Sequence, residues 1–222
     1  SYDFKDRIAN NNNIVPTFQS YNSISDAYSY ATDDYYGIMD ADEGNLSINE
    51  KQDVATGRIL VSNNQQAKIV VDKILNYYSE ASLGNWRNNL CLFTDDFYNE
   101  SEFVFQTDME AIADGIKINF PQFNINKLYA DSFKKVYTTS TASYPDLNIA
   151  LSNAVETGTL VIDYFGHGGE LGLGSEHLLR IPDIKSWFNF DKSPLFITVT
   201  CEFSKFDNPS RVTAGEEMIL NK

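Results

Sequence analysis

The sequence predicts an α/β fold in which helices cover both faces of a mostly parallel β-sheet. Segments with strand character alternate along the chain with segments whose apolar residues recur at helical spacing. Residues 160–165 and 195–200 are the two most apolar and β-branched runs, which is typical of strands that are covered on both faces. Alternating strands and helices imply right-handed crossovers between parallel strands.

The composition of the chain changes at Gly57. Residues 1–56 are rich in Asn, Asp, Ser and Tyr, with short apolar pieces between turn-forming residues. We therefore expect this part to be the loop-rich end of a first subdomain. Residues 57–222 carry the regular alternation and form the predicted α/β subdomain.

Within the second part, strands and helices are expected in strict alternation. A short strand at 59–61 precedes a helix that begins near Ser62 or Asn63, because either side chain can cap a helix. We expect the two apolar runs named above to be central, adjacent strands. The other expected elements are strands at 90–94 and 125–130, and helices at 103–116, at 145–155 with an end near Gly158, near 184–188, and from about Thr213.

Charge and hydropathy exclude several classes of function. The chain has 31 acidic and 17 basic residues, a net charge of -14, which would repel a phosphate backbone. Nucleic acid is therefore not an expected partner. No apolar run approaches the roughly 20 residues that cross a bilayer. The first residues do not resemble a signal peptide, so the protein is either cytosolic or has lost its original N-terminus.

Two reactive residues directly follow the two apolar strands. His167 lies in a Gly-His-Gly-Gly stretch after the first strand, and Cys201 follows the second. Ligands of open parallel sheets bind outside the carboxyl ends of the strands, so we predict that the two side chains meet there. An imidazole beside a thiol makes a nucleophile for acyl transfer. The alternative is structural, because a Cys after an apolar strand is often a small buried residue and Gly-His-Gly is often a turn.

The glycines around His167 fit the same chemistry. They remove side chains where a peptide would approach, and they leave backbone N–H groups free to bind a developing oxyanion. The other cysteine, Cys91, lies between leucines inside a predicted strand, and we expect it to be buried and unreactive. One disulfide between the two cysteines is formally allowed.

Two stretches of sequence resemble the His and Cys motifs of the gingipain-like peptidase family C25. They are residues 163–170, DYFGHGGE, and 196–204, FITVTCEFS, and further similarity lies at 57–60, 71–74 and 86–96. The resemblance implies a caspase–gingipain-like three-layer α/β/α sandwich with a mostly parallel sheet. It also implies that Cys201 is the nucleophile, that His167 is its general base, and that the backbone N–H groups of Gly168 and Cys201 form the oxyanion hole.

The same resemblance indicates further site residues. In this family an acidic residue orients the catalytic His, and ungapped counting back from His167 places Asp108 at that position. Gly169, Glu170 and Glu202 flank the two motifs and are expected to contact substrate. For the three carboxylates, a solvated surface role is the alternative.

No cofactor and no metal are expected. Gingipains bind calcium, and residues 40–50 are acidic here, with Asp40, Asp42, Glu43 and Glu50. An EF-hand loop that starts at Asp40 would need Gly at position 45 and Glu at position 51, which are Asn and Lys in this chain.

Within the family, residues 201–207 and 210–216 are most similar to the signal peptidase and sortase-like transpeptidase of type IX secretion. This likeness implies a surface protein that removes C-terminal signal domains from exported substrates through a thioester and works beside outer-membrane secretion components. A general endopeptidase and a non-catalytic surface-binding module are the alternatives. The resemblance also implies that the chain is truncated at both ends, with a strand before Ser1 and another after Lys222.

Overall fold

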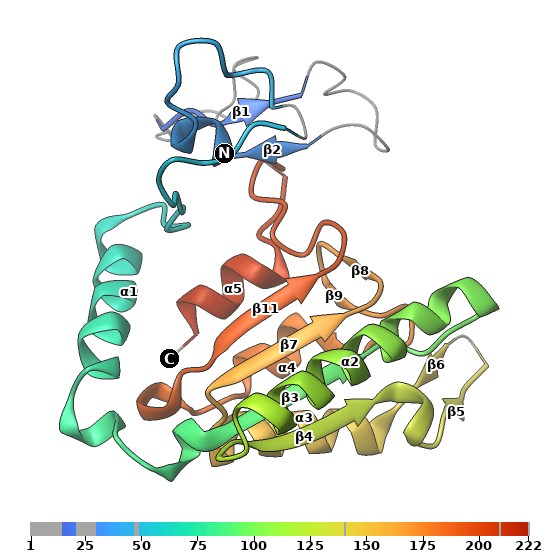
Figure 1. Cartoon of the computed structure of the whole chain (residues 1–222). Helices are drawn as coiled ribbons and strands as arrows, with labels where there is room; N and C mark the ends of the chain where they lie inside the picture. The colour runs from blue at the N-terminus through green and yellow to red at the C-terminus, as the bar shows by residue number, and fades with distance from the viewer. Residues whose placement is uncertain (1–14, 21–29, 47–48, 140, 209, 222) are drawn as a thin grey trace.

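The central feature of the computed structural model is a four-stranded parallel sheet with helices on both faces (Figure 1). The structure describes residues 15–20, 30–46, 49–139, 141–208 and 210–221. The strand order is β11-β7-β3-β4, so the predicted three-layer α/β class is confirmed. The strands are β3 (Asn89–Thr94), β4 (Asn124–Tyr129), β7 (Val161–Phe165) and β11 (Leu195–Val199).

The two faces of the sheet are covered by different helices. On one face, α2 (Val104–Asn119) buries Met109 and Ala113 against Leu92 of β3 and Tyr129 of β4. The other face carries the larger core, in which Phe93 and Tyr164 pack under three helices. These helices are α3 (Pro145–Thr157), α4 (Ile181–Lys185) and α5 (Ala214–Leu220).

Local signals explain where several helices begin and end. The helix α1 (Asn64–Tyr77) starts after Asn63, whose side chain accepts the Gln66 N–H, as predicted. Thr213 and Glu216 form a capping box at the start of α5. The end of α3 is Gly158, which has a φ of 105°, a conformation that favours glycine.

Short elements complete the fold. Before α1, a two-stranded antiparallel pair lies next to the loop that follows β11, and Gln19 donates to Asp207 in that loop (Figure 1). The short strands are β1 (Phe18–Gln19), β2 (Ala31–Thr32), β5 (Val136–Tyr137), β6 (Ala142–Ser143), β8 (Gly168–Gly169), β9 (Gly172–Leu173) and β10 (Leu179–Arg180). The 3-10 helices are η1 (Asp34–Gly37), η2 (Glu80–Ser82), η3 (Asn85–Asn88), η4 (Glu100–Phe103), η5 (Ala130–Ser132) and η6 (Phe190–Lys192).

The predicted strand at 59–61 is wrong. These residues pair with no strand in the described part of the chain, and Ile59 is exposed. The preceding Arg58 is held by two hydrogen bonds to Asp33, at 2.6 and 2.7 Å. Residues 59–61 therefore connect the Arg58–Asp33 ion pair to α1.

The prediction that both apolar runs form central strands holds for β7 and is wrong for β11. In the described sheet β11 is an edge strand, and Leu195, Ile197 and Val199 are exposed. Among the described residues, β11 pairs only with β7, and α2 packs on β3 and β4, which leaves one face of β11 uncovered.

The helix expected near 184–188 begins earlier than predicted, as α4. Asp183, whose carboxylate accepts the Arg180 N–H at 2.9 Å, and Pro182 in the first turn set its start. Trp187, beyond the helix end, is buried in the core instead.

Gly158 provides a test of the packing at the end of α3. A Cβ at this position would lie 2.6 Å from Trp86 Cβ and 2.8 Å from Lys192 Cδ. We expect Gly158→Ala to lower the free energy of unfolding by about 1–3 kcal/mol, measured by urea denaturation.

Gly115→Ala is the matched control, because Gly115 lies inside α2 with no atom within 4 Å of its Cβ position. It should raise stability by about 0.5–1 kcal/mol, and equal effects of the two substitutions would contradict the account.

Candidate active site

His167 and Cys201 lie beyond the carboxyl ends of two neighbouring parallel strands. The last registered pair of β7 and β11 is Phe165 with Val199, and the Gly166 N–H donates to the Val199 carbonyl at 3.3 Å. His167 and Cys201 each follow two residues after that pair. The expectation that the two strands are adjacent and parallel is therefore confirmed.

The backbone after His167 packs directly on the backbone around Cys201. A Cβ on Gly168 would lie 2.4 Å from Thr200 Oγ1 and 3.2 Å from the Cys201 carbonyl oxygen. Only glycine fits there. The sequence interpretation, that the glycines make room for substrate, applies to Gly169, whose Cβ position has no atom within 4 Å. Gly168 instead makes room for Thr200 and Cys201, which follow β11.

The two cysteines have opposite environments. Cys201 is exposed, Cys91 is buried, and both are free thiols, so no disulfide joins them. Burial raises the pKa of the Cys91 thiol to about 12, which agrees with the predicted inert core position. Glu202, directly after Cys201, has a φ of 52°, a strained conformation for a residue with a side chain. The chain thus turns sharply at the exposed thiol.

A carboxylate that was not predicted lies beside the His167 ring. Glu102 Oε1 is 3.6 Å from His167 Nε2, an ion-pair distance rather than a direct hydrogen bond. The Tyr98 N–H donates to Glu102 at 2.8 Å, and this bond holds the pKa of the Glu102 carboxyl below its ordinary value. The ring of Phe105 packs edge-on against the imidazole at 5.4 Å.

Asp108 does not occupy the predicted position beside His167. It is exposed on α2, and no ion pair between it and His167 exists in the structure. Ungapped counting back from His167 could not find Glu102, because Glu102 lies on η4 and approaches His167 only in the folded chain. A signal for this helix start was present in the sequence, because Asn99 caps η4 three residues before Glu102.

A cleft of about 620 Å³ opens beside His167; the predicted residues Gly168, Gly169, Glu170 and Glu202 line it, and Cys201 does not. Glu170 is held by Asn208 at 2.6 Å and by Arg211 at 3.2 Å. Glu202 accepts a hydrogen bond from Lys205 at 2.7 Å. The lining consists of the loop 167–175, His177, residues 179–182, Glu202 and Arg211.

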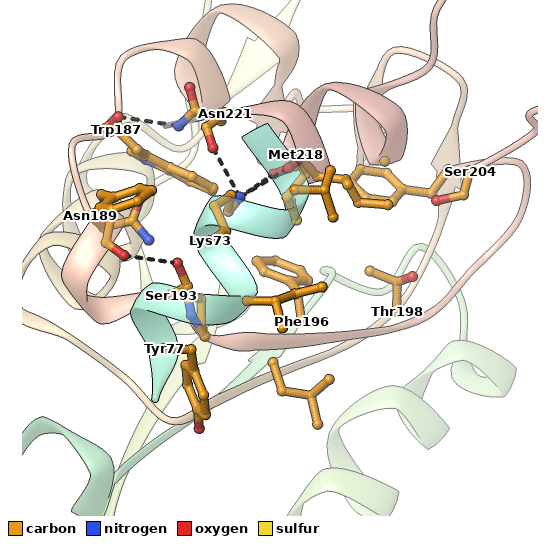
Figure 2. A pocket seen from close by; sticks show the side chains of 18 of the residues that line it. Lys73, Tyr77, Trp187, Asn189, Ser193, Phe196, Thr198, Ser204, Met218 and Asn221 are labelled. Carbon is orange, nitrogen blue, oxygen red and sulfur yellow. Dashed lines mark hydrogen bonds between the residues drawn. The ribbon is translucent and has the colours of Figure 1, made fainter. Parts of the chain in front are cut away.

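A second cavity of about 490 Å³ lies between α1, β11 and α5 (Figure 2). Figure 2 shows Lys73 reaching from α1 to the last residues of α5, where it donates to the carbonyls of Met218, Ile219 and Asn221. Burial lowers the pKa of Lys73. These Lys73 contacts join α1 to α5. Neither His167 nor Cys201 lines this cavity.

Among the described residues, one cluster has the composition of a metal site. Asp95, Asp96 and Glu176 are buried with carboxylate oxygens within 4.8 Å of one another. Lys135 Nζ lies 2.6 Å from Asp96 and 2.9 Å from Glu176 and supplies the cluster with an internal counterion. We assign neither a metal nor a cofactor to it. No helix in the described ranges is both long and apolar enough to cross a membrane.

Comparison with known proteins identifies the family. The family model described as Peptidase family C25 matches residues 1–222. A comparison with the curated proteins gave no match.

Solved structures share the fold. The crystal structure of the Arg-specific cysteine proteinase gingipain R (RgpB) matches with a TM-score of 0.65 at 18% identity, over 86% of this chain and 40% of that chain. The complex of Porphyromonas gingivalis RgpB pro- and mature domains gives 0.63 at 18%, over 87% and 41%. A structure titled "Structure of Protease" gives 0.61 at 21%, over 86% and 38%. The chain therefore spans about two fifths of the length of these proteins.

The two cysteines should differ sharply in reactivity. Iodoacetamide should modify Cys201 in the native protein, whereas Cys91 should react only after unfolding, because its thiol is inaccessible and its pKa is about 12. Peptide mapping by mass spectrometry at neutral pH measures both rates, and urea-unfolded protein is the control in which the rates converge. Equal rates in the native protein would contradict the assignment.

Proposed function

Because the chain belongs to peptidase family C25, a family of cysteine peptidases, we propose that it is the catalytic part of a PorU-like peptidase and transpeptidase. Such an enzyme removes C-terminal secretion signals from exported proteins. The observation that carries the proposal is the position of His167 and the exposed Cys201, each two residues beyond the last registered pair of β7 and β11.

The proposed reaction begins at the scissile carbonyl of the substrate. His167 removes the thiol proton as Cys201 Sγ attacks the carbonyl carbon. The oxyanion that forms accepts hydrogen bonds from the backbone N–H groups of Gly168 and Cys201. The C–N bond then breaks, and His167 returns the proton to the leaving amine, which leaves a thioester on Cys201. Water releases an acid from this thioester, and an amine releases an amide, so one intermediate serves hydrolysis and transpeptidation.

In this reaction Glu102 is the acid that orients His167, the role that the sequence comparison gave to Asp108. Its carboxylate faces Nε2 of His167, so it orients the ring and stabilises the imidazolium that forms. The 3.6 Å separation suits a contact that tightens when substrate binds. The cleft beside His167 then receives the peptide.

The family implies protein substrates, and the finer assignment rests on residues 201–207 and 210–216. Their similarity to PorU supports cargo with C-terminal signal domains as substrates, outer-membrane secretion components as partners, and a location at the cell surface. A general endopeptidase is the second candidate, since RgpB is an Arg-specific proteinase of the same fold. The only carboxylates that line the described cleft, Glu170 and Glu202, are paired with Arg211 and Lys205. An arginine side chain would find no unpaired carboxylate in that lining, which argues against an arginine specificity like that of RgpB.

Replacement of either member of the dyad should stop cargo maturation in the full-length protein. Cys201→Ala removes the attacking atom, and we expect stability to change by only about 1 kcal/mol. His167→Ala should lower the cleavage rate by roughly 10²–10⁴-fold, and the double variant should be no worse than Cys201→Ala, because the two groups act as one unit. Immunoblots of cargo with and without its C-terminal signal give the readout. Normal cargo maturation in the Cys201→Ala protein would contradict the peptidase proposal and indicate a non-catalytic surface-binding module.

A second pair of variants distinguishes the two acidic residues. Glu102→Gln should lower kcat by roughly ten- to a hundred-fold, because an amide cannot stabilise the imidazolium. Asp108→Asn is the matched control, since it removes a carboxylate from the exposed face of α2, and should leave kcat unchanged. A loss of kcat in Asp108→Asn but not in Glu102→Gln would instead assign the orienting carboxylate to Asp108, as expected from the sequence.

A further inference from the structure

Asp95 is a buried carboxyl group that binds the backbone of His167. It follows β3 directly, and its side chain is almost fully buried. Its Oδ2 accepts the His167 N–H at 3.0 Å, and its Oδ1 accepts the Asp96 N–H at 3.1 Å. The Asp95 N–H in turn donates to the Phe165 carbonyl at 3.2 Å. Asp95 therefore fastens the end of β3 to the loop that carries His167.

The backbone carbonyl of His167 has hydrogen-bond partners as well. The carbonyl of His167 accepts the hydroxyl of Tyr164 at 2.7 Å and the N–H of Gly174 at 2.9 Å. All polar backbone atoms of His167 thus have partners, although its side chain is 46% exposed. The direction of the imidazole and of the following Gly168 N–H depends on these three contacts.

Two glycines of this loop lie against the Asp95 side chain. A Cβ on Gly166 would lie 2.4 Å from Asp95 Cβ, and one on Gly174 would lie 3.0 Å from Asp95 Oδ1. Gly174 also has a φ of 66°, which favours glycine. The glycine-rich sequence around His167 is therefore fitted to Asp95, as well as to the strand that carries Cys201.

We propose that Asp95 is a positioning residue of the peptidase, which holds His167 and the Gly168 N–H in their reactive directions only when Asp95 is a carboxylate. This inference rests on the proposed function of His167 and Cys201. A carboxylate accepts both N–H groups with charge-assisted bonds. A protonated carboxyl keeps one full acceptor and loosens the other bond.

The surroundings of Asp95 make this change occur near neutral pH. Burial, together with the nearby charges of Asp96 and Glu176, raises the pKa of Asp95 to about 7. Tyr164 of β7 faces it from the sheet, and Lys135 neutralises part of the charge of Asp96 and Glu176. Asp96 Oδ1 and Glu176 Oε2 are buried without a hydrogen-bond partner, so this cluster has free acceptors for the O–H of a protonated Asp95.

The experiment compares Asp95→Asn with Asp96→Asn in the full-length enzyme. Asn at position 95 can accept only one of the two N–H groups, so we expect kcat to fall roughly ten- to a hundred-fold with little change in KM. The parent should lose kcat as the pH falls through about 7, and Asp95→Asn should lack this step. Asp96→Asn is the matched control, because Asp96 binds Lys135 and Tyr144 through its side chain. It should keep the kcat of the parent at high pH, and its pH step should remain but move to lower pH, because the charge of Asp96 no longer raises the pKa of Asp95.

Two readouts separate failure of this inference from failure of the proposed function. Hydrogen exchange at the His167 amide should be faster in Asp95→Asn whether or not the protein is a peptidase. The folded-state pKa of about 7 lies above the unfolded value of about 3.9. Protonated Asp95 therefore stabilises the fold fully below about pH 4, and this stabilisation is lost as the pH rises through about 7. The parent should show this loss and Asp95→Asn should not.

An unchanged His167 amide and an unchanged pH profile of kcat in Asp95→Asn would overturn the inference. An equal loss of kcat in Asp96→Asn would overturn it as well. If Asp95→Asn does not fold, Asp95→Glu keeps the charge but moves it by one methylene. That variant should keep the pH step at a lower kcat, and a kcat equal to that of the parent would count against the proposed role.

Discussion

The parallel register of β3, β7 and β11 is the constraint on which the candidate site depends. Thr94, Phe165 and Val199 end the three strands side by side, so the next residues of each strand emerge at one edge of the sheet. Asp95 comes from the first strand, His167 from the second and Cys201 from the third. A shift of one residue in any strand would exchange its buried and exposed side chains and separate these groups.

The loop after Cys201 is fixed by parts of the chain that are distant in sequence. Gln19 binds Asp207, and the Arg58 guanidinium lies 5.1 Å over the Phe206 ring. On the other side, the Glu170 carbonyl accepts the Ala214 N–H. These contacts surround the strained turn at Glu202, and strain of this kind persists only where the surrounding structure enforces it. The segment before α1 thus supports the proposed nucleophile without contributing to the chemistry.

The sequence predicted the features that are set locally. The caps at Asn63 and Thr213, the strand before Asp95 and the two strand ends at His167 and Cys201 follow from residue type and period. Features that depend on tertiary contacts escaped it. An apolar run does not reveal whether a second strand will pair with it, so β11 was expected to be central. Glu102 and Asp95 approach His167 only through the fold, and their carboxylates resemble any surface acid in the sequence.

The central claim is that the Cys201 thiol and the His167 imidazole act together on a carbonyl carbon. A crystal structure of the full-length protein treated with a peptide aldehyde tests it most directly. The account predicts a hemithioacetal on Cys201 Sγ, with its oxygen about 3 Å from the N–H groups of Gly168 and Cys201 and with a His167 ring nitrogen in hydrogen-bond reach. An unmodified Cys201, or a His167 ring more than about 8 Å from the sulfur in an ordered site, would contradict it.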